Sequence, residues 1–223
     1  NLPEGGTGKS PLVFYITQLF LDHDITPSIL RRGYGRATSG FYTVQYHSLA
    51  SQLGDEPVMF AKRYGQQVGV AVGEDRTLAI PQTLLHYPDT QVIVMDDGFR
   101  HRRVEPDLSI ITSSYQELVS RDMLLPAGRL RESPHSLRRA QAIVITKCPR
   151  SITDAEMARI RGELSAYCSV PVYFAMTDYM TPQAMTNKRL YKTVVAIAGI
   201  SRSFTFMQHI EAHYSVKLAH RYP

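Results

Sequence analysis

The segment Gly5–Ser10, near the first residue of the chain, has the residue types and the spacing that bind a polyphosphate. Its glycines let successive backbone N–H groups point inward at phosphate oxygens, the Lys9 ammonium can reach the outer phosphates, and the Ser10 hydroxyl can ligate Mg²⁺. An apolar periodic run begins at Pro11, so the phosphates would also sit at a helix N-terminus, where the dipole favours anions. Pro3 stands where the strict motif has its first glycine. The sequence predicts a phosphate-binding loop; the alternative is a plain Gly-rich turn.

Two acidic pairs are candidates for metal binding and proton transfer. Asp96 and Asp97 follow the apolar run Val92–Met95, and ligands of open α/β sheets collect beyond the carboxyl ends of the strands. A carboxylate there can hold Mg²⁺ opposite a phosphate loop, and two adjacent carboxylates are costly without a cation. The alternative is that Asp96-Asp97-Gly98 forms only a turn after a strand. We favour the metal site.

The second acidic pair, Asp55 and Glu56, lies between Gly54 and Pro57. A helix cap alone explains it, because Asp is a good N-cap, Glu favours the first turn and proline tolerates an early helical position. The same pair would also suit a kinase, which needs metal coordination and a group that accepts a hydroxyl proton. The residues by themselves favour the cap, with Asp55 as the N-cap residue.

Basic residues follow Asp97 in the stretch Phe99–Arg103, which contains His101 and three arginines. They could neutralise charge on a transferring phosphoryl group or clamp a substrate phosphate, or they could form a solvated turn. The partly apolar segment Leu124–Glu132 ends in charged residues, and loops of this kind often carry ligand contacts.

Composition limits the class of protein. The chain has 223 residues, of which 43% are hydrophobic, enough for one α/β core with a small appended lobe. We expect neither a signal peptide nor a membrane span, since no apolar run approaches ~20 residues. Cys148 and Cys168 lack metal-ligand spacing and suit a reduced cytosolic protein. The net charge of +5 favours anionic partners, and the lack of interleaved aromatic residues argues against nucleic acid.

Apolar runs of strand length alternate with helical patterns, which is typical of a parallel sheet wrapped by helices. The predicted helices are Pro11–Asp22, Glu56–Tyr64, Arg76–His86, Thr153–Tyr167 and Ser203–His213. The predicted strands are Ser28–Leu30, Val68–Ala71, Val92–Met95, Leu108–Ile111, Ala142–Thr146, Val172–Ala175 and Val194–Ala198, with Phe41–Tyr46 as an edge strand.

These elements predict an α/β fold of the P-loop NTPase type, with a mostly parallel sheet flanked by helices and part of a second, smaller lobe. Residues 1–175 would form the core and residues 176–223 the start of the C-terminal lobe. Because the chain has no initiator Met and no strand ahead of the phosphate loop, we expect a fragment trimmed at both ends.

Several motifs, taken in order, resemble one family, the tetraacyldisaccharide 4'-kinases of lipid A biosynthesis in Gram-negative bacteria. The matching segments are Gly5-Gly6-Thr7-Gly8-Lys9-Ser10-Pro11, Arg32-Gly33-Tyr34-Gly35, Gly54-Asp55-Glu56-Pro57, Asp96-Asp97-Gly98-Phe99 with His101 and Arg102, Leu124-Leu125-Pro126-Ala127-Gly128 with Leu130-Arg131-Glu132, and Gly199-Ile200 with Phe204 or Phe206. A phosphate loop alone is a weak signal, whereas the ordered set is specific.

The resemblance implies transfer of the γ-phosphate of ATP to the 4'-hydroxyl of a tetraacylated glucosamine disaccharide 1-phosphate. It implies ATP and Mg²⁺ as cofactors, and a lipid A disaccharide precursor and the inner-membrane surface as partners. The enzyme would work at the cytoplasmic face of the bacterial inner membrane.

The resemblance also implies roles for individual residues. Asp55 would be the catalytic carboxylate, assisted by Lys9, whereas Ser10, Glu56, Asp96 and Asp97 would serve the metal. The ATP loop would consist of Pro3, Glu4, Gly5, Gly6, Thr7, Gly8, Lys9 and Ser10, and the residues near the substrate would be His101, Arg102, Arg131 and Glu132. The family's Asp-His-His stretch, whose histidine partners the catalytic carboxylate, would begin after Pro223.

Two other classes of P-loop protein are the rival hypotheses. A switch ATPase that positions a protein partner carries an extra lysine before the double glycine, where this chain has Glu4. A GTP switch reads guanine at a strand end similar to Ile145-Thr146-Lys147, but Cys148-Pro149 offers no carboxylate for the base edge. A requirement of ATP turnover for a lipid disaccharide acceptor would separate the kinase from the switch ATPase.

Overall fold

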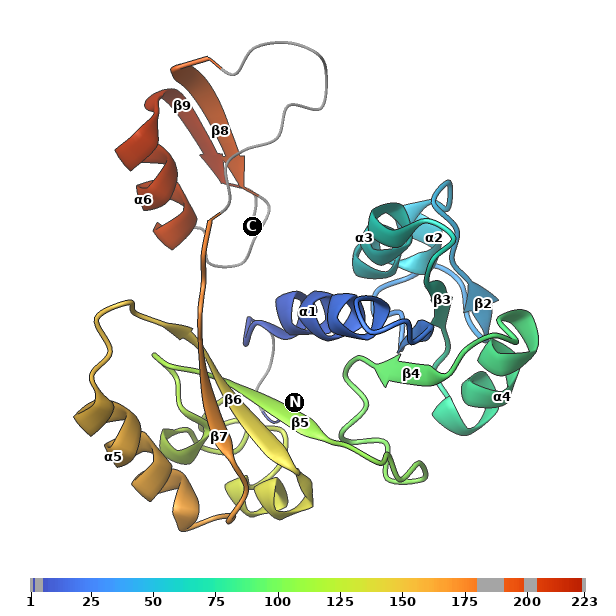
Figure 1. Ribbon diagram of the computed structural model, residues 1–223, viewed down its shortest axis with the longest axis horizontal. Coiled ribbons are helices and arrows are strands. Elements are labelled where there is room, and N and C mark those ends of the chain that lie inside the picture. Colours follow the sequence, from blue (N-terminus) through green and yellow to red (C-terminus); the bar gives the residue numbers. More distant parts are fainter. Residues whose placement is uncertain (1, 3–5, 180–190, 199–203, 222–223) are drawn as a thin grey trace. The chain divides into compact units, whose positions relative to one another are not determined.

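The computed structural model describes residues 2, 6–179, 191–198 and 204–221 (Figure 1). The chain divides into two compact units, Asn1–Ala175 and Met176–Pro223. Glu4 and the segment Gly199-Ile200 of the sequence analysis lie outside the described residues.

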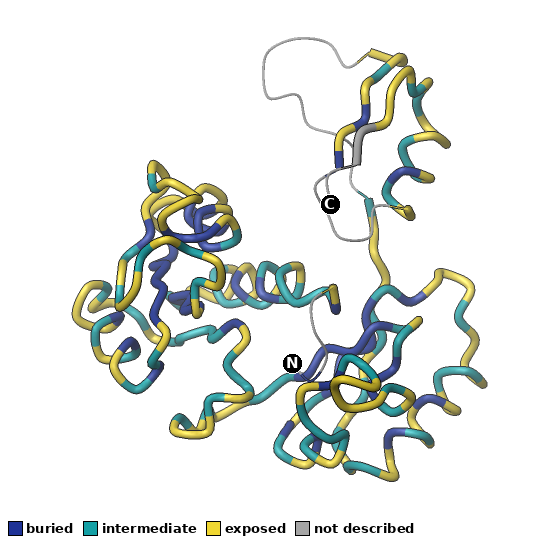
Figure 2. The backbone as a smooth tube through the Cα atoms, turned by 180° about the vertical axis from the view of Figure 1, so that it is seen from behind, coloured by how far each residue is buried: buried dark blue, intermediate teal, exposed yellow. Residues whose placement is uncertain are grey.

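The first sheet of the larger unit has the strand order β2-β3-β1-β4. Its strands are β1 (Pro27–Arg31), β2 (Tyr42–Thr43), β3 (Gly69–Val72) and β4 (Val92–Met95). β1 pairs in parallel with β3 and β4, whereas β2 runs antiparallel along the edge of β3, which confirms the predicted edge strand in a shorter form. β1 and β3 are buried along their whole length, as strands covered on both faces must be (Figure 2).

The helices of this half of the unit are α1 (Lys9–Leu21), α2 (Ala50–Leu53), α3 (Asp55–Tyr64) and α4 (Arg76–His86). α1 and α3 pack with β1 and β3 around one hydrophobic cluster that contains Ile29, Phe60 and Val70. α4 begins at a genuine cap, because the Asp75 side chain accepts a hydrogen bond from Thr77 N over 2.9 Å.

The second sheet of the larger unit has the order β5-β6-β7, with β5 (Ile110–Ser114), β6 (Ala142–Cys148) and β7 (Val172–Met176). α5 (Asp154–Ser165) packs against it through Ile160 and Leu164, and short 3₁₀ helices span Val119–Arg121 and Pro134–Arg139. Leu2, which precedes the phosphate loop, is fully buried in the same cluster.

The predicted strand Leu108–Ile111 was wrong in its bounds, because β5 runs from Ile110 to Ser114. Thr112, Ser113 and Ser114 are buried although they are polar. Two of the three hydroxyls find partners in the fold: Thr112 Oγ1 is hydrogen-bonded to Thr7 Oγ1, and Ser113 Oγ accepts a hydrogen bond from Val119 N over 2.9 Å. Because this end of the strand is polar, it lacks the apolar run by which sequence analysis recognises a buried strand.

The smaller unit is a β-α-β arrangement of β8 (Thr193–Ala198), α6 (Phe204–His213) and β9 (Ser215–Arg221). β8 and β9 pair in parallel, and Met207 of α6 packs on Ala196 and Ala198. Sequence analysis missed β9.

The α/β class with mostly parallel strands flanked by helices is confirmed. In the described residues the strands fall into three sheets instead of the single parallel sheet that the alternation of elements suggested. No helix among the described residues is both long and apolar enough to span a membrane.

Candidate active site

The predicted phosphate loop ends where α1 begins. Gly8 precedes the helix with φ 75° and ψ 25°, and Gly6 also has a positive φ of 72°. A Cβ atom at Gly8 would come within 3.2 Å of the Thr146 side chain, so glycine suits this left-handed and closely packed position. Gly8 supplies no side-chain cap, which leaves the first N–H groups of α1 for an anion. Pro3, Glu4 and Gly5 lie outside the described residues.

The loop is fixed to the ends of β5 and β6. The Thr7 and Thr112 hydroxyls are hydrogen-bonded over 2.9 Å, and Thr146 Oγ1 donates to the Thr7 carbonyl over 2.8 Å. Lys147 Nζ donates to the Gly6 carbonyl over 2.7 Å. These contacts hold the loop in place from one flank, so its backbone amides are positioned before any ligand arrives.

On the other flank, the first turn of α1 meets two carboxylates. Ser10 Oγ donates a hydrogen bond to Glu56 Oε1 over 2.5 Å, and Lys9 Nζ lies 3.7 Å from Asp97 Oδ1. Glu56 is in the first turn of α3, and Asp97 follows β4 with a left-handed φ of 58°. The structure therefore brings together predicted residues that lie far apart in the sequence.

Arg31, the last residue of β1, joins the two acidic pairs. Its Nη2 atom forms an ion pair with Glu56 and lies 2.9 Å from Asp96 Oδ2. Arg31 and Asp96 are both buried, with 8% and 3% of their surface exposed. Sequence analysis did not place Arg31 in the site, and the signal that was available is an arginine at the end of a buried strand.

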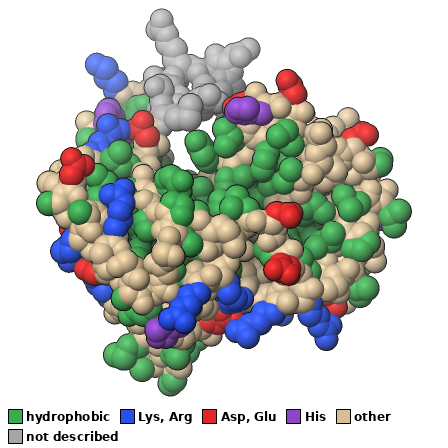
Figure 3. All heavy atoms as spheres, turned by 60° about the horizontal axis from the view of Figure 1, so that its bottom comes forward, with side chains coloured by type: hydrophobic (Ala, Val, Ile, Leu, Met, Phe, Trp, Pro, Cys, Tyr) green, Lys and Arg blue, Asp and Glu red, His purple; other side chains and the backbone are tan. Residues whose placement is uncertain are grey.

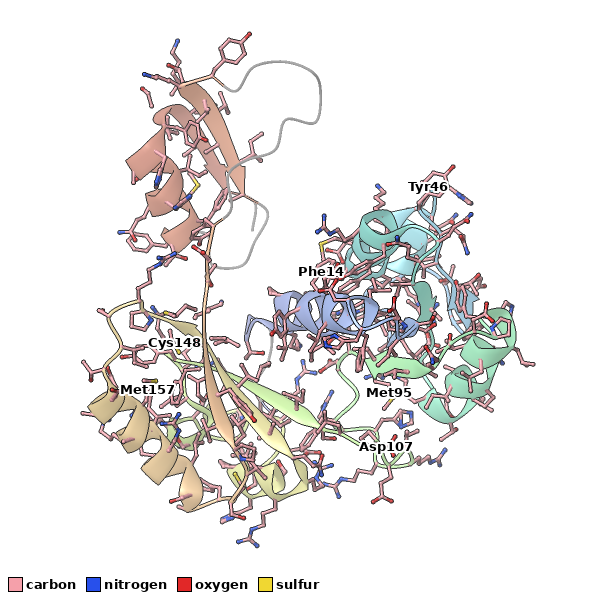
Figure 4. All side chains as sticks on the ribbon, in the orientation of Figure 1. Phe14, Tyr46, Met95, Asp107, Cys148 and Met157 are labelled. Carbon is pink, nitrogen blue, oxygen red and sulfur yellow. The ribbon has the colours of Figure 1, made fainter. Side chains whose placement is uncertain are left out.

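Asp96 is the most buried carboxylate of the group, and it follows Met95, which Figure 4 labels at the end of β4. Burial raises the pKa of its carboxyl group, and the positive charges of Arg31 and Lys9 oppose that rise. Asp96 Oδ2 makes no hydrogen bond within the described residues, because Arg31 approaches it without hydrogen-bond alignment. A nearby cation would offset the cost of this unsatisfied oxygen.

Ser10, Glu56, Asp96 and Asp97 offer the oxygen ligands that Mg²⁺ prefers. Across the residues that the structure describes, no three His, Cys, Asp or Glu side chains are grouped to hold a metal ion by themselves. Mg²⁺ usually keeps several waters and takes one or two carboxylates together with substrate phosphates. The residues therefore fit a magnesium ion that arrives with a polyphosphate.

Asp55 is the first residue of α3, and the helix cap is Gly54, with φ 93° and ψ 150°. The interpretation of Asp55 as the N-cap residue was therefore wrong. Gly54 holds the N-cap position, and the helix starts at Asp55, one residue earlier than predicted. Asp55 Oδ1 accepts a hydrogen bond from Glu56 N over 2.9 Å, and the side chain is exposed. An exposed carboxylate beside Glu56 is accessible to a substrate hydroxyl.

His101 is held by the start of α4. Its Nε2 atom accepts a hydrogen bond from Arg76 N over 2.9 Å and lies 3.6 Å from Asp75 Oδ1. Burial, followed by the charge of Arg76, lowers the pKa of the His101 ring, and Asp75 opposes this. The neutral imidazole is thus the form that this hydrogen bond requires.

Arg76 itself was not singled out by the sequence. It is 2% exposed, and its Nη1 atom donates to the Gly73 carbonyl over 2.6 Å. Its Nη2 atom donates a hydrogen bond to the Asp96 carbonyl over 3.4 Å, so the guanidinium contacts the backbone of the turn that contains Asp96 and Asp97.

The remaining predicted substrate residues belong to a second network. Glu132 forms an ion pair with Arg139 and lies 3.7 Å from Arg102. Arg139 in turn stacks over the Phe99 ring at 4.2 Å. The exposed Arg131 donates its backbone N–H to the Leu2 carbonyl over 2.9 Å, just ahead of the phosphate loop. Among the described residues, the backbone bond of Arg131 to Leu2 is the link between this group and the start of the loop, and none of the contacts given above reaches Asp55.

The chain is similar to known proteins over its whole length. The family model LpxK, described as tetraacyldisaccharide-1-P 4'-kinase, matches residues 1–223. The tetraacyldisaccharide 4'-kinase of Flavobacterium johnsoniae is 35% identical over 217 residues, which cover 95% of this chain and 63% of the relative. The kinase of the same name from Porphyromonas gingivalis is 33% identical over 230 residues, covering 100% of this chain and 64% of the relative.

A solved structure shares the fold. The crystal structure of the "apo" form of LpxK from Aquifex aeolicus in complex with ATP matches with a TM-score of 0.74 and 28% identity, covering 100% of this chain and 69% of that one. This chain spans less than two thirds of the length of both curated relatives, 63% and 64%. The chain belongs to the tetraacyldisaccharide-1-P 4'-kinase family.

Proposed function

We propose that this protein transfers the γ-phosphate of ATP to the 4'-hydroxyl of a tetraacylated glucosamine disaccharide 1-phosphate. The observation that carries the proposal is the meeting of a helix N-terminus with carboxylates from two other elements, shown by the contact of Ser10 with Glu56 and of Lys9 with Asp97. An anion site that faces acidic groups suits a polyphosphate that shares a magnesium ion with them. Family membership supports the choice of acceptor.

In this proposal the loop residues bind the triphosphate. The backbone N–H groups from Gly6 to Ser10 hold the phosphate oxygens, and Lys9 offsets the charge that builds up on the β- and γ-phosphates. Pro3, Glu4 and Gly5 would complete the loop. Mg²⁺, when bound, would neutralise phosphate charge and orient the γ-phosphoryl group. Ser10, Glu56, Asp96 and Asp97 would hold it.

Asp55 would act on the acceptor. Its exposed carboxylate accepts or orients the proton of the sugar hydroxyl while the hydroxyl oxygen forms a bond to the γ-phosphorus. The bond from that phosphorus to the β–γ bridging oxygen breaks, and ADP leaves with its electron pair. Most of the rate acceleration comes from positioning and electrostatics, because phosphoryl transfer requires little covalent chemistry from the protein.

Polar and apolar groups would receive the rest of the substrate. His101, Arg102, Arg131 and Glu132 would border the acceptor sugar. Met123, Leu124 and Leu125 are exposed by 63%, 48% and 49%. Independently of these three residues, Figure 3 shows hydrophobic and basic side chains together on one face of the molecule. Such a surface suits acyl chains and anionic headgroups, so we place the enzyme at the cytoplasmic face of the inner membrane. Residues 1–175 would be the kinase core and residues 176–223 the start of a second lobe.

The test is product formation by the full-length protein. With [γ-³²P]ATP, Mg²⁺ and the tetraacyl disaccharide 1-phosphate, we expect a labelled bisphosphate whose new phosphate is on the 4'-oxygen by NMR. ATP hydrolysis that proceeds equally without the lipid would favour a switch ATPase and contradict the proposal.

A further inference from the structure

The three carboxylates that would hold Mg²⁺, those of Glu56, Asp96 and Asp97, are each paired with a cation of the chain itself. Arg31 Nη2 forms an ion pair with Glu56 and lies 2.9 Å from Asp96 Oδ2, whereas Lys9 Nζ lies 3.7 Å from Asp97 Oδ1. Two positive charges thus face three negative charges. The attraction of this cluster for a divalent cation is weak, because the positive groups a few ångströms away oppose it.

Arg31 lies where its charge acts strongly on its neighbours. Its guanidinium carbon is 5.6 Å from the centroid of the Phe60 ring, which is fully buried, and Arg31 itself is 8% exposed. Charges interact more strongly where water is excluded. Glu56 accepts hydrogen bonds through both carboxylate oxygens, Oε1 from Ser10 and Oε2 from Arg31. A metal ion that binds Glu56 therefore competes with donors of the chain.

Two other cations near these carboxylates act differently. Lys9 belongs to the phosphate loop, and in the proposed function its ammonium serves the phosphates, which releases Asp97. Arg76 donates to the backbone carbonyl of Asp96 over 3.4 Å. Of these three cations, Arg31 is the one that pairs with two candidate metal ligands at once.

We propose that Arg31 makes metal binding conditional on the nucleotide: its guanidinium holds Glu56 and Asp96 and disfavours Mg²⁺ until a triphosphate supplies further negatively charged oxygens. This assignment rests on the proposed function. The β- and γ-phosphates add negative charge and oxygen ligands together, which outweigh the repulsion from Arg31. Arg31 is a positioning residue that acts through the two carboxylates, and it couples the binding of metal to the binding of ATP.

The test measures binding of Mn²⁺, which prefers the same oxygen ligands, to the full-length protein without nucleotide by electron paramagnetic resonance. We expect weak binding by the wild type. Arg31→Met removes the positive charge and should raise the Mn²⁺ affinity at least about tenfold. Arg63→Met is the matched control, because Arg63 is an exposed arginine in the last turn of α3, the helix that carries Glu56. It should leave the Mn²⁺ affinity unchanged.

Thermal unfolding checks that each variant is folded. If Arg31→Met does not fold, Arg31→Lys decides the question, because a lysine ammonium is a point charge without the fork that joins two carboxylates. Arg31→Lys should raise the Mn²⁺ affinity by a smaller factor than Arg31→Met.

An unchanged Mn²⁺ affinity in the deciding variant would overturn the proposal, and so would a wild type that binds Mn²⁺ equally tightly without nucleotide. The proposed function has a separate readout, the affinity of the wild type for ATP with and without Mg²⁺. If Mg²⁺ did not strengthen ATP binding, the metal site of the proposed function would fail, so the two failures are distinguishable.

Discussion

The Ser10 hydroxyl donates a hydrogen bond to Glu56 Oε1 over 2.5 Å and so connects the first turn of α1 with the first turn of α3. This bond joins the hydroxyl and the carboxylate that would hold magnesium. Glu56→Ala should therefore lower the affinity for ATP measured with Mg²⁺ more than the affinity for ATP measured without Mg²⁺. Calorimetric titrations with and without Mg²⁺ measure this, and an unchanged Mg²⁺ dependence would remove Glu56 from the metal site.

Lys9→Ala should abolish most ATP-dependent turnover of the full-length protein. Its ammonium lies beside Asp97 at the start of α1, where it would meet developing phosphate charge. Loss of one such group should lower kcat by a factor of about 10² to 10³. Lys62→Ala is the matched control, because Lys62 is exposed in the last turn of α3. Equal activities for the two variants would contradict the role of Lys9.

Asp55→Asn should lower turnover severely and leave nucleotide affinity almost unchanged. The exposed Asp55 carboxylate accepts a local hydrogen bond from Glu56 N, and an amide oxygen can still accept that bond while the side chain loses its basicity. We expect a fall in kcat of about 10² to 10⁴. Asp89→Asn, in an exposed turn after α4, is the control. Full turnover by Asp55→Asn would take Asp55 out of the mechanism.

Arg31→Met should destabilise the fold. Removal of the guanidinium leaves the buried Asp96 carboxylate without its closest positive charge, and breaking such a pair costs about 3 to 5 kcal/mol. Urea unfolding measures this change in the free energy of unfolding. The double variant Arg31→Met, Asp96→Asn should recover part of the loss, since the uncompensated charge is gone. Strictly additive losses would show that Arg31 does not stabilise Asp96.

The pH dependence of stability should reflect His101. Burial and the charge of Arg76 hold the pKa of its ring below the usual value of about 6.5, so the folded protein binds a proton less readily than the unfolded chain. Its contribution to stability is complete above about pH 6.5 and is lost as the pH falls through the lowered pKa.

His101→Gln should flatten this acid limb, because an amide oxygen can accept the Arg76 N–H hydrogen bond at any pH. His23→Gln, at an exposed position after α1, is the matched surface control. The free energy of unfolding between pH 5 and pH 8 is the measurement. The same slope in His101→Gln and in the wild type would show that another group controls the acid limb.

The sequence predicted those elements whose residues carry a local pattern. Val92–Met95 and Arg76–His86 match β4 and α4, because the strand is a continuous apolar run and the helix has a capping aspartate before it. The bounds of β5 were misplaced, and β9 was missed. Thr112, in the polar half of β5, is hydrogen-bonded to Thr7, which lies 105 residues away in the sequence, and no local pattern predicts such a contact.

The residues of the candidate site likewise include some that a local sequence pattern reveals and some that it does not. The phosphate loop and the acidic pairs are visible as short motifs, since phosphate and metal chemistry requires particular residue types in sequence. Arg31 and Arg76 are not recognisable from any short motif, because their importance comes from burial beside Asp96. No local pattern encodes where a strand end or a helix start will meet another element.

The most direct measurement is a crystal structure of the full-length protein with a non-hydrolysable ATP analogue and Mg²⁺. The account predicts the β- and γ-phosphates on the N–H groups of Gly6 to Ser10, with the metal between Ser10 Oγ and the carboxylates of Asp96, Asp97 or Glu56. An analogue bound away from α1, with the contacts of these carboxylates to Ser10, Arg31 and Lys9 unchanged, would contradict it.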